Sequence, residues 1–121
     1  MPPALLALAL LHLAIGASIG LSVDEAHYLL YAAHPDWSYF DHPPLVGWVQ
    51  WPLVALDAPV WLARALPGAL WLLSAWGIFH VTGRLRPAQR DAGLWALAAF
   101  ALAPVIHVLG IGLVPDTLLM A

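Results

Sequence analysis

The stretch DEAHYLLYAAHPDWSYFDHPP, residues 24–44, is a polar segment between two long apolar segments. It contains more than half of the chain's seven acidic residues and half of its six histidines: Asp24, Glu25, Asp36, Asp41, His27, His34 and His42. Side chains that exchange protons or bind ions are therefore concentrated there. We expect the functional site to include this stretch and the apolar segments to hold it in place.

The composition indicates an integral membrane protein. Of the 121 residues, 63% are hydrophobic and 9% are charged, and the mean hydropathy is +0.85. Soluble globular domains carry about 25% charged residues, so the chain lies far outside that class. The net charge of −3 is small, and no basic patch of the kind that binds nucleic acids is present. The absence of cysteine excludes a disulfide framework and a thiolate metal site.

Apolar segments long enough to cross a bilayer, which requires about 20 helical residues, divide the chain. We predict a single membrane domain over residues 1–121, with spans at residues 3–21, 59–83 and 88–113 and a fourth starting at about residue 116. The N-terminus lacks the basic residues of a cleaved signal peptide, so the first span is predicted to be an uncleaved anchor. The chain stops within an apolar run, so we expect it to be the first part of a longer protein.

The loop formed by residues 22–58 is predicted to contain two short helices. Ser22 is a suitable N-cap for a helix from Val23 to about Ala33, and Pro35 ends that helix because proline disfavours helix in the preceding residue. Residues 45–56 are apolar but too few to span, and their two tryptophans favour the membrane interface. We expect this second helix to lie along the membrane surface.

The arginines predict the orientation of the chain. Arg84, Arg86 and Arg90 fall in the short connection of residues 84–90. The positive-inside rule places such a loop in the cytoplasm. Alternation of the spans then puts the polar stretch and the Pro115-Asp116 turn together on the non-cytoplasmic side.

Two acids that follow the first span directly, Asp24 and Glu25, are candidates for a catalytic base. Adjacent helical residues point about 100° apart, so we expect only one of them to face a given cavity. Alternatively, the pair marks the membrane boundary and is stabilised by the helix macrodipole.

Histidines of the loop are candidates for a metal site. His27, His34 and His42, with Asp41 and one acid of the 24–25 pair, are imidazole and carboxylate ligands. No HExxH or comparable spacing is present, so hydrogen bonding to backbone or water is the favoured alternative. The histidines in or beside the spans are expected to be packed or snorkelling groups: His12, His80 and His107.

Arg64 lies within a predicted span, where a charge is costly and indicates a functional site. It is suited to bind a lipid phosphate, because guanidinium matches phosphate bidentately. The alternative is an ion pair with Asp57 or with an acid of the loop. Asp116, after Pro115, is predicted to be the N-cap of the fourth helix.

Four motifs of the chain resemble the bacterial family 39 glycosyltransferases, which are relatives of the protein O-mannosyltransferases and of the lipid A aminoarabinose transferase. The motifs are Asp24-Glu25-Ala26-His27-Tyr28, residues 39–45, Ala63-Arg64-Ala65-Leu66-Pro67 and Val114-Pro115-Asp116. The resemblance covers essentially the whole chain. It implies the GT-C fold, an all-α membrane fold, of which this chain would be the N-terminal part, with three spans, the start of a fourth and interfacial helices in the first outer loop.

The resemblance also implies an activity. A sugar is transferred, with inversion, from a polyprenyl-phosphate donor to a lipid or protein acceptor at the outer face of a bacterial inner membrane. Asp24 would act as base or position the acceptor, with Glu25 beside it and Asp116 as a second acid. The implied substrate-binding residues are Arg64, His27, Tyr39, Asp41, His42, Pro43 and Pro44. No cofactor is implied with certainty, and a divalent cation stays open. Since the family's later spans complete donor binding, we expect this piece to be inactive alone.

A transporter fragment or an assembly subunit with an ion-binding loop is the alternative from another class. A transporter would place ionisable groups near the bilayer midplane in broken helices. A metal-dependent membrane hydrolase is a third hypothesis, weakened by the missing ligand spacing. Convergence of Asp24 and Asp116 on one cavity would favour the enzyme.

Overall fold

The computed structural model describes residues 3–121, and over that range its secondary structure is helical. The helices are α1 (Pro3–Ser18), α2 (Val23–Ala33), α3 (Leu45–Ala55), α4 (Val60–Ala63), α5 (Ala65–Leu85), α6 (Ala92–Leu102), α7 (Pro104–Ile111) and α8 (Pro115–Met120). The all-helical class predicted in the sequence analysis is confirmed for these residues.

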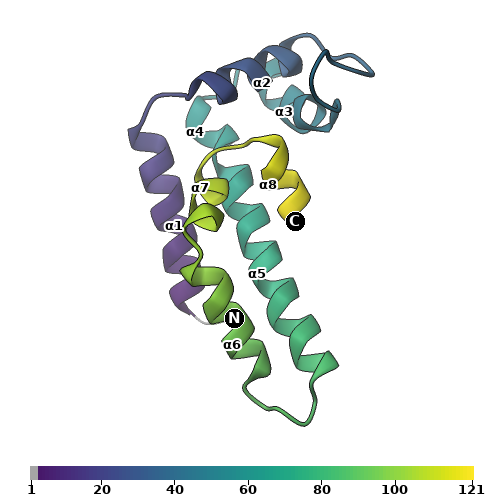
Figure 1. The fold of residues 1–121 in the computed structure, drawn as a ribbon. Helices are drawn as coiled ribbons and strands as arrows, with labels where there is room; N and C mark the ends of the chain where they lie inside the picture. Colours follow the sequence, from purple (N-terminus) through teal and green to yellow (C-terminus); the bar gives the residue numbers. More distant parts are fainter. Residues whose placement is uncertain (1–2) are drawn as a thin grey trace.

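The long helix α5 is the centre of the bundle (Figure 1). It contacts α1, α4, α6, α7 and α8. Its Trp71 is completely buried, in a core that also contains Leu5, Ala9, Ala75 and Leu97. This core is apolar on every contributing helix, so burial of hydrophobic side chains holds the elongated part of the molecule together.

The pair α2 and α3 lies across one end of the bundle (Figure 1). Ser22 caps α2: its Oγ accepts a hydrogen bond from the backbone N–H of Glu25, and Glu25 Oε2 accepts one from the N–H of Ser22. This reciprocal capping box stabilises the first turn. The predicted N-cap and both predicted ends of this helix are confirmed. A second, aromatic core joins the two helices through Tyr28, Tyr31 and Val46.

The membrane spans differ in part from the prediction. Residues 60–85, which are α4 and α5 together, are long and apolar enough to cross a membrane alone. The pairs α1–α2 and α6–α7 reach that length only as bent pairs, with bends of 87° and 72°. Residues 3–121 therefore contain one helix long and apolar enough to span, or up to three if each bent pair is one span.

The third predicted span, residues 88–113, is not one continuous helix. It begins at Ala92, after turns at residues 87–91, and is interrupted at Ala103. The reason for the interruption is Pro104, which lacks an N–H and disfavours helical conformation in the residue before it. The fold therefore breaks this apolar run at its one internal proline.

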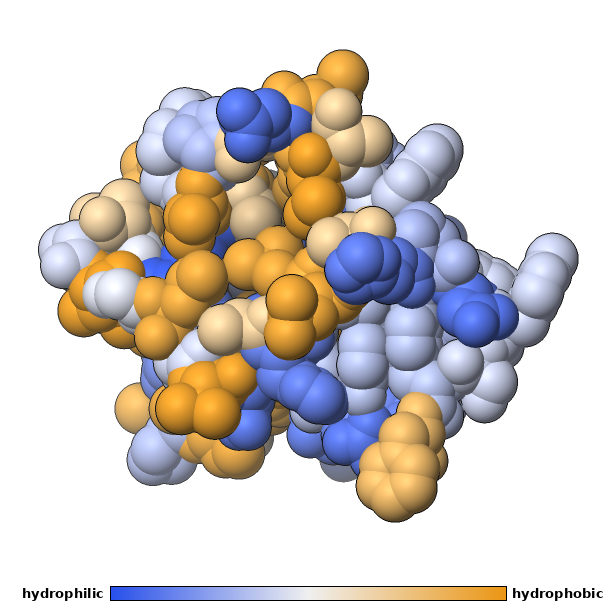
Figure 2. Space-filling view, turned by 90° about the horizontal axis from the view of Figure 1, so that it is seen from above, coloured by the Kyte–Doolittle hydropathy of each residue, from blue (hydrophilic) through white to orange (hydrophobic). Residues whose placement is uncertain are grey.

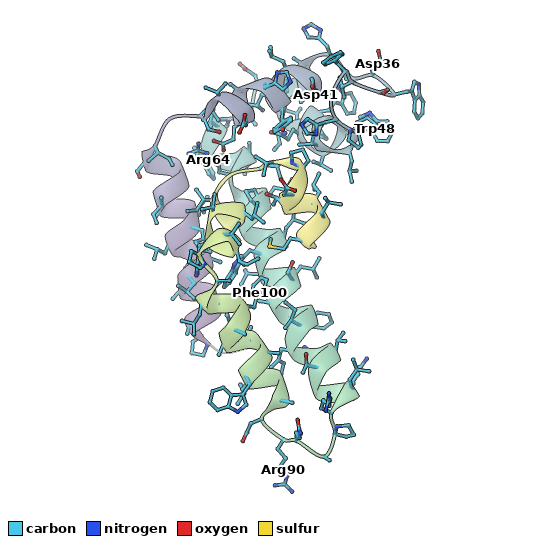
Figure 3. All side chains as sticks on the ribbon, in the orientation of Figure 1. Asp36, Asp41, Trp48, Arg64, Arg90 and Phe100 are labelled. Atoms are coloured by element: carbon cyan, nitrogen blue, oxygen red, sulfur yellow. The ribbon has the colours of Figure 1, made fainter. Side chains whose placement is uncertain are left out.

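The two polar parts of the chain lie at opposite ends of the molecule. The polar stretch 24–44 and the start of α8 lie together at one end, and the α5–α6 connection lies at the other (Figure 1). Asp41 and Arg90 mark these ends in Figure 3. Figure 2, which views the molecule from the end that carries α2, shows hydrophilic side chains gathered among apolar ones.

Candidate functional site

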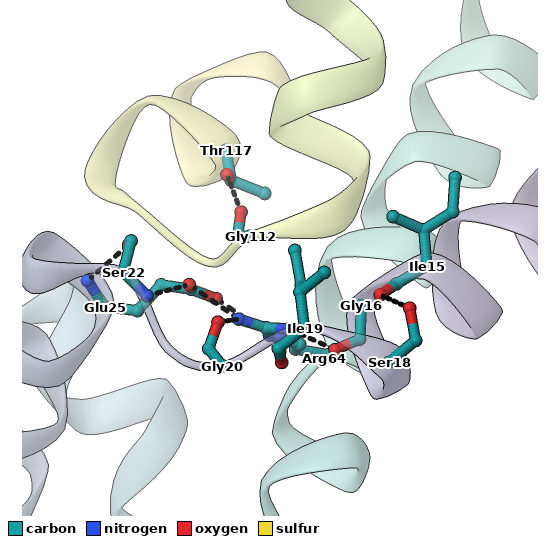
Figure 4. Close-up of polar contacts among 10 residues, drawn as sticks. All are labelled: Ile15, Gly16, Ser18, Ile19, Gly20, Ser22, Glu25, Arg64, Gly112 and Thr117. Atoms are coloured by element: carbon teal, nitrogen blue, oxygen red, sulfur yellow. Dashed lines mark hydrogen bonds and ion pairs between the residues drawn. The ribbon is translucent and has the colours of Figure 1, made fainter.

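Arg64 and Glu25 form a buried ion pair where α1, α2 and α4 meet (Figure 4). Arg64 Nε donates to Glu25 Oε1 at 3.0 Å, and one terminal nitrogen donates to Oε2 at 2.8 Å. Arg64 is 2% exposed. The two planar groups therefore pair bidentately, which is the strongest geometry available to these side chains.

The remaining donors of Arg64 bind the end of α1. Arg64 donates these N–H groups to three carbonyl oxygens: that of Ile19 at 2.9 Å, that of Gly20 at 2.8 Å, and that of Gly16. A guanidinium has five N–H donors, and all five are used. Since no donor is left for a phosphate, this geometry supports the ion-pair alternative for Arg64, with a loop acid rather than Asp57 as the partner.

Glu25 is equally occupied. Oε1 accepts from Arg64, and Oε2 accepts from Arg64 and from the Ser22 N–H. Its carboxylate holds α2 at the end of α1 and points away from solvent. Of the adjacent acids 24 and 25, Asp24 is thus the exposed one. The S-x-x-E spacing of Ser22 and Glu25 is a capping-box signal that could have identified this role from the sequence.

Asp41 is the centre of a hydrogen-bonded cluster beside α2. Its Oδ1 accepts a short hydrogen bond from the Tyr31 hydroxyl. Its Oδ2 lies 3.6 Å from His27 Nε2 and 3.8 Å from His42 Nε2. The Tyr31 hydroxyl uses its proton to donate to Asp41, so its oxygen is free to accept a hydrogen bond. His27 Nε2, which lies 2.8 Å from the Tyr31 hydroxyl oxygen, is therefore the donor to that hydroxyl.

The hydrogen bond between Tyr31 and Asp41 shifts the pKa values of both side chains. The hydrogen bond to Asp41, then burial and the charge of Asp41, raise the pKa of Tyr31 to about 12. The same bond lowers the pKa of Asp41, with a smaller contribution of the same sign from His42. Both shifts favour a neutral tyrosine that donates to a charged carboxylate.

Tyr28 connects this cluster to two further acids. Its ring is buried, and its hydroxyl lies 3.0 Å from His42 Nε2. Burial raises the pKa of Tyr28, and so do the nearby charges of Asp24, Asp41 and Asp116. Three carboxylates from separate segments of the chain therefore lie near enough to this phenol for their charges to raise its pKa. The sequence predicts that Asp24 and Asp116 lie on the same side of the membrane, and in the structure the charges of both act on Tyr28.

Asp116 lies in the first turn of α8 but is not its N-cap, so that prediction is wrong. Val114 holds the N-cap position, since Pro115 already has helical conformation at the first position. The N–H of Val114 donates instead to Thr117 Oγ1 at 3.3 Å. Asp116 is exposed, as is Asp24, and neither belongs to any ion pair formed among residues 3–121.

A pocket of about 270 Å³ separates the start of α3 from α8. Its polar lining is His42 and Asp116, and the rest is apolar: Pro43, Leu45, Val46, Pro115, Leu118 and Leu119. Pro43 lines one wall of the pocket, and Pro44 is the N-cap residue of α3. The sequence predicted Asp116 and His42 on the same side of the membrane but did not predict their shared pocket, and Asp24 is not among the residues that line it.

Tyr39 supports the cluster from behind. Its ring stacks on Tyr31, with centroids 3.8 Å apart and planes 4° apart, and its hydroxyl donates to the Tyr31 carbonyl at 2.7 Å. Within residues 3–121, no group of three or more histidine and acidic side chains is arranged to hold a metal ion. Tyr28 and Tyr31 are site residues that sequence reasoning did not select. Their spacing from His27 on one helix was the available signal.

A separate polar contact lies inside the bundle. His12 Nε2 and His107 Nδ1 are 2.8 Å apart, and His107 Nε2 lies 2.8 Å from the Ala101 carbonyl oxygen, to which it donates. His12 is 2% exposed and meets the Trp71 ring edge to face. These two histidines are packed against each other, as a core interpretation predicts.

The chain was compared with known proteins by family, by sequence and by structure. It matches no protein-family model, no curated protein and no solved structure.

Proposed function

We propose that this chain is part of a membrane glycosyltransferase of the family 39 type, with a GT-C fold. It would transfer a sugar from a polyprenyl-phosphate donor to a lipid or protein acceptor. One observation carries the proposal: Asp24, Asp41 and Asp116, from three separate segments, lie near enough to Tyr28 for their charges to raise its pKa, and the Tyr28 hydroxyl lies 3.0 Å from His42, which lines a pocket with Asp116. These acids belong to three of the motifs on which the family resemblance rests.

A membrane location is supported by the outer surface of the bundle. Large apolar side chains are exposed along it, including Leu6, Leu10, Leu73, Trp76, Leu94 and Trp95. Such a surface is costly in water and favourable in lipid. The arginine-bearing α5–α6 connection would face the cytoplasm. The other end of the bundle, with the polar stretch 24–44 and the start of α8, would face the periplasm or the cell exterior.

In the proposed reaction Asp24 takes the proton of the acceptor hydroxyl. The acceptor oxygen forms a bond to the anomeric carbon while the bond from that carbon to the phosphate oxygen breaks. Polyprenyl phosphate leaves with the electron pair, so the anomeric centre inverts. Asp24 suits this task because it is exposed in the first turn of α2 and belongs to no ion pair within residues 3–121.

The phosphate needs a cationic or hydrogen-bonding partner other than Arg64, whose donors are all used. We assign this role to His42, which lines the pocket together with Asp116. A polyprenyl phosphate is a good leaving group, so a hydrogen bond suffices and no strong acid is required.

The test measures transfer of labelled sugar from polyprenyl-phosphate donors in membranes. One membrane preparation contains the chain alone, and another contains the longer protein of which we propose it is part. Asp24→Asn is expected to lower transfer by about 100-fold or more, the usual contribution of a general base. Asp57→Asn is the control: Asp57 is exposed and has a left-handed backbone that asparagine also tolerates. Equal activity of the two variants would remove Asp24 from the mechanism.

A transporter is the second candidate, because the His12–His107 contact places ionisable groups beside the break between α6 and α7. Transporters bind ions at such broken helices. This function predicts ion-coupled uptake into proteoliposomes that is lost in His107→Ala. Absence of sugar transfer from every donor, together with such uptake, would replace the enzyme by the transporter.

A further inference from the structure

A second concave surface lies near the hydrogen-bonded cluster centred on Asp41, which is called the carboxylate cluster below. It is an open groove of about 630 Å³ lined by Pro35, Asp36, Trp37 and Trp48. The indole rings of Trp37 and Trp48 meet edge to face, with centroids 5.4 Å apart and planes at 90°. Trp37 is 83% exposed, so its ring lies open to a ligand. Figure 3 shows Asp36 and Trp48 at the same end of the molecule as Asp41.

Hydrogen bonds fix the walls of this groove. Trp48 Nε1 donates to the Asp36 carbonyl at 3.0 Å, and Asp36 Oδ1 accepts from the Trp37 N–H at 2.6 Å. The second carboxylate oxygen of Asp36 has no hydrogen-bond partner within residues 3–121. The groove is therefore preorganised, with two aromatic faces and one acceptor available to a ligand.

We propose that this groove binds a neutral saccharide through one pyranose ring. A pyranose has an apolar face of C–H groups, which packs on an indole ring, and a rim of hydroxyl groups. Adjacent hydroxyls can donate to the free oxygen of Asp36 as charge-assisted hydrogen bonds. The carboxylate repels anionic sugars, so the ligand carries no negative charge in this ring.

Insertion into the membrane interface is the competing explanation for exposed tryptophans. Two observations favour the sugar. Asp36 lines the groove together with both rings, and moving a carboxylate toward lipid is costly. The indole N–H of Trp48, which an interfacial tryptophan offers to headgroups, is already bonded within the protein.

Tyr39 connects the groove to the carboxylate cluster around Asp41. Tyr39 accepts a hydrogen bond from the Asp36 N–H at 3.1 Å and stacks on Tyr31, whose hydroxyl binds Asp41. A sugar in the groove thus lies next to the proposed transfer site. The inference that this sugar is part of the enzyme's substrate rests on the proposed function, whereas the binding of a sugar in the groove does not.

The experiment is saturation-transfer difference NMR on the full chain in lipid nanodiscs. The probes are methyl β-D-glucopyranoside and methyl α-D-mannopyranoside. Alkyl glycoside detergents must be absent, because their headgroups are themselves pyranosides. Trp37→Ala is expected to weaken binding about tenfold, since it removes the main stacking face. Trp95→Ala on α6, where the ring is 75% exposed, is the matched control and should bind as wild type.

Two further variants separate the alternatives. Asp36→Asn keeps the contact to the Trp37 N–H and is expected to weaken binding about threefold, and Asp24→Asn should bind sugar normally even if transfer is lost. No saturation transfer to either glycoside in wild type, or equal binding by Trp37→Ala and Trp95→Ala, overturns the proposal. Quenching of Trp37 by brominated phosphatidylcholine, with sugar binding unchanged in Trp37→Ala, would make it a membrane anchor instead.

Discussion

Arg64 shows how a single side chain can organise three segments of a chain. Its guanidinium carries a positive charge and is almost fully buried. Such a charge is tolerated only where each donor has a partner, and here the partners are one carboxylate and three carbonyl oxygens. The arginine therefore acts as a structural residue whose loss affects the whole site.

Arg64→Lys is expected to destabilise the protein by about 1–3 kcal/mol, the cost of leaving buried hydrogen-bonding groups without a partner. Lysine keeps the charge but has three donors on one nitrogen, so it cannot serve Glu25 and the end of α1 together. Thermal unfolding followed by circular dichroism measures the loss. Arg90→Lys, in the exposed connection, is the control and should unfold as wild type does. Equal stability of the two variants would contradict the structural role.

Tyr31 gives a prediction about pH. Its pKa is about 12 in the folded chain, against an ordinary value of 10.0, so the fold favours the neutral phenol. The resulting stabilisation is complete below pH 10 and is lost as the pH rises from about 10 to about 12. Titration of tyrosinate absorbance should therefore contain a step at about 12.

Two substitutions check the cause of that step. Tyr31→Phe is expected to remove it, and Asp41→Asn to move it toward the ordinary value, because the charged acceptor is gone. Asp57→Asn should leave it in place, because Asp57 belongs to no ion pair within residues 3–121. The pKa of Asp41 is shifted down, so its own contribution is present above about pH 4 and is lost as the pH falls through the lowered value.

At the scale of elements, the contact between α2 and α3 determines the shape of the site. Gly47 on α3 lies directly against Tyr31 on α2: an added Cβ would be 2.9 Å from Tyr31 Cβ and 3.1 Å from the Tyr39 hydroxyl. No larger residue fits there without a shift. The two helices can thus approach closely only because position 47 has no side chain.

Gly47→Ala is accordingly expected to destabilise the protein by about 1–3 kcal/mol, the usual cost of overpacking. Gly77→Ala is the matched control, because an added Cβ at position 77 of α5 has no neighbour within 4 Å. There alanine should be neutral or stabilising by up to about 1 kcal/mol, since it is the better helix former. Denaturation midpoints of the two variants in the same lipid or detergent test this difference. A neutral Gly47→Ala would contradict the close packing.

Local signals in the sequence predicted the elements better than they predicted the contacts. Ser22 and Pro35 determine both ends of α2, because a cap and a proline act on their own neighbours. The break at Ala103 was also predictable from Pro104 but was not predicted. The choice of Glu25 over Asp57 as the partner of Arg64 depends on how α1, α2 and α4 meet, which no local pattern specifies.

The polar stretch 24–44 lies at one end of the molecule and the arginine-bearing α5–α6 connection at the other, with an apolar bundle between them (Figures 1 and 3). The sequence predicted this separation from the positions of the arginines and acids. It did not predict the bends of 87° and 72°, which leave one helix of residues 3–121 able to span alone. The length of an apolar segment does not show where its helix breaks, so apolar length alone cannot specify the number of crossings.

The membrane orientation can be tested directly because the chain has no cysteine. Ser38→Cys and Gln89→Cys introduce single thiols at exposed positions of the two ends. In intact spheroplasts, a membrane-impermeant maleimide is expected to label the Ser38→Cys variant and not the Gln89→Cys variant. Lysis should make both variants react equally, which serves as the control. Labelling of both variants, or only of Gln89→Cys, in intact cells would refute the proposed orientation.

The contact of Arg64 with the end of α1 has a consequence for biosynthesis. The carbonyls of Gly16, Ile19 and Gly20 receive their hydrogen bonds from a residue at least 44 positions later in the chain. During synthesis these carbonyls lack their partner until Arg64 has been translated, so water or lipid headgroups must accept that role first. The end of α1 therefore reaches its final hydrogen bonding only after a segment translated much later has packed against it.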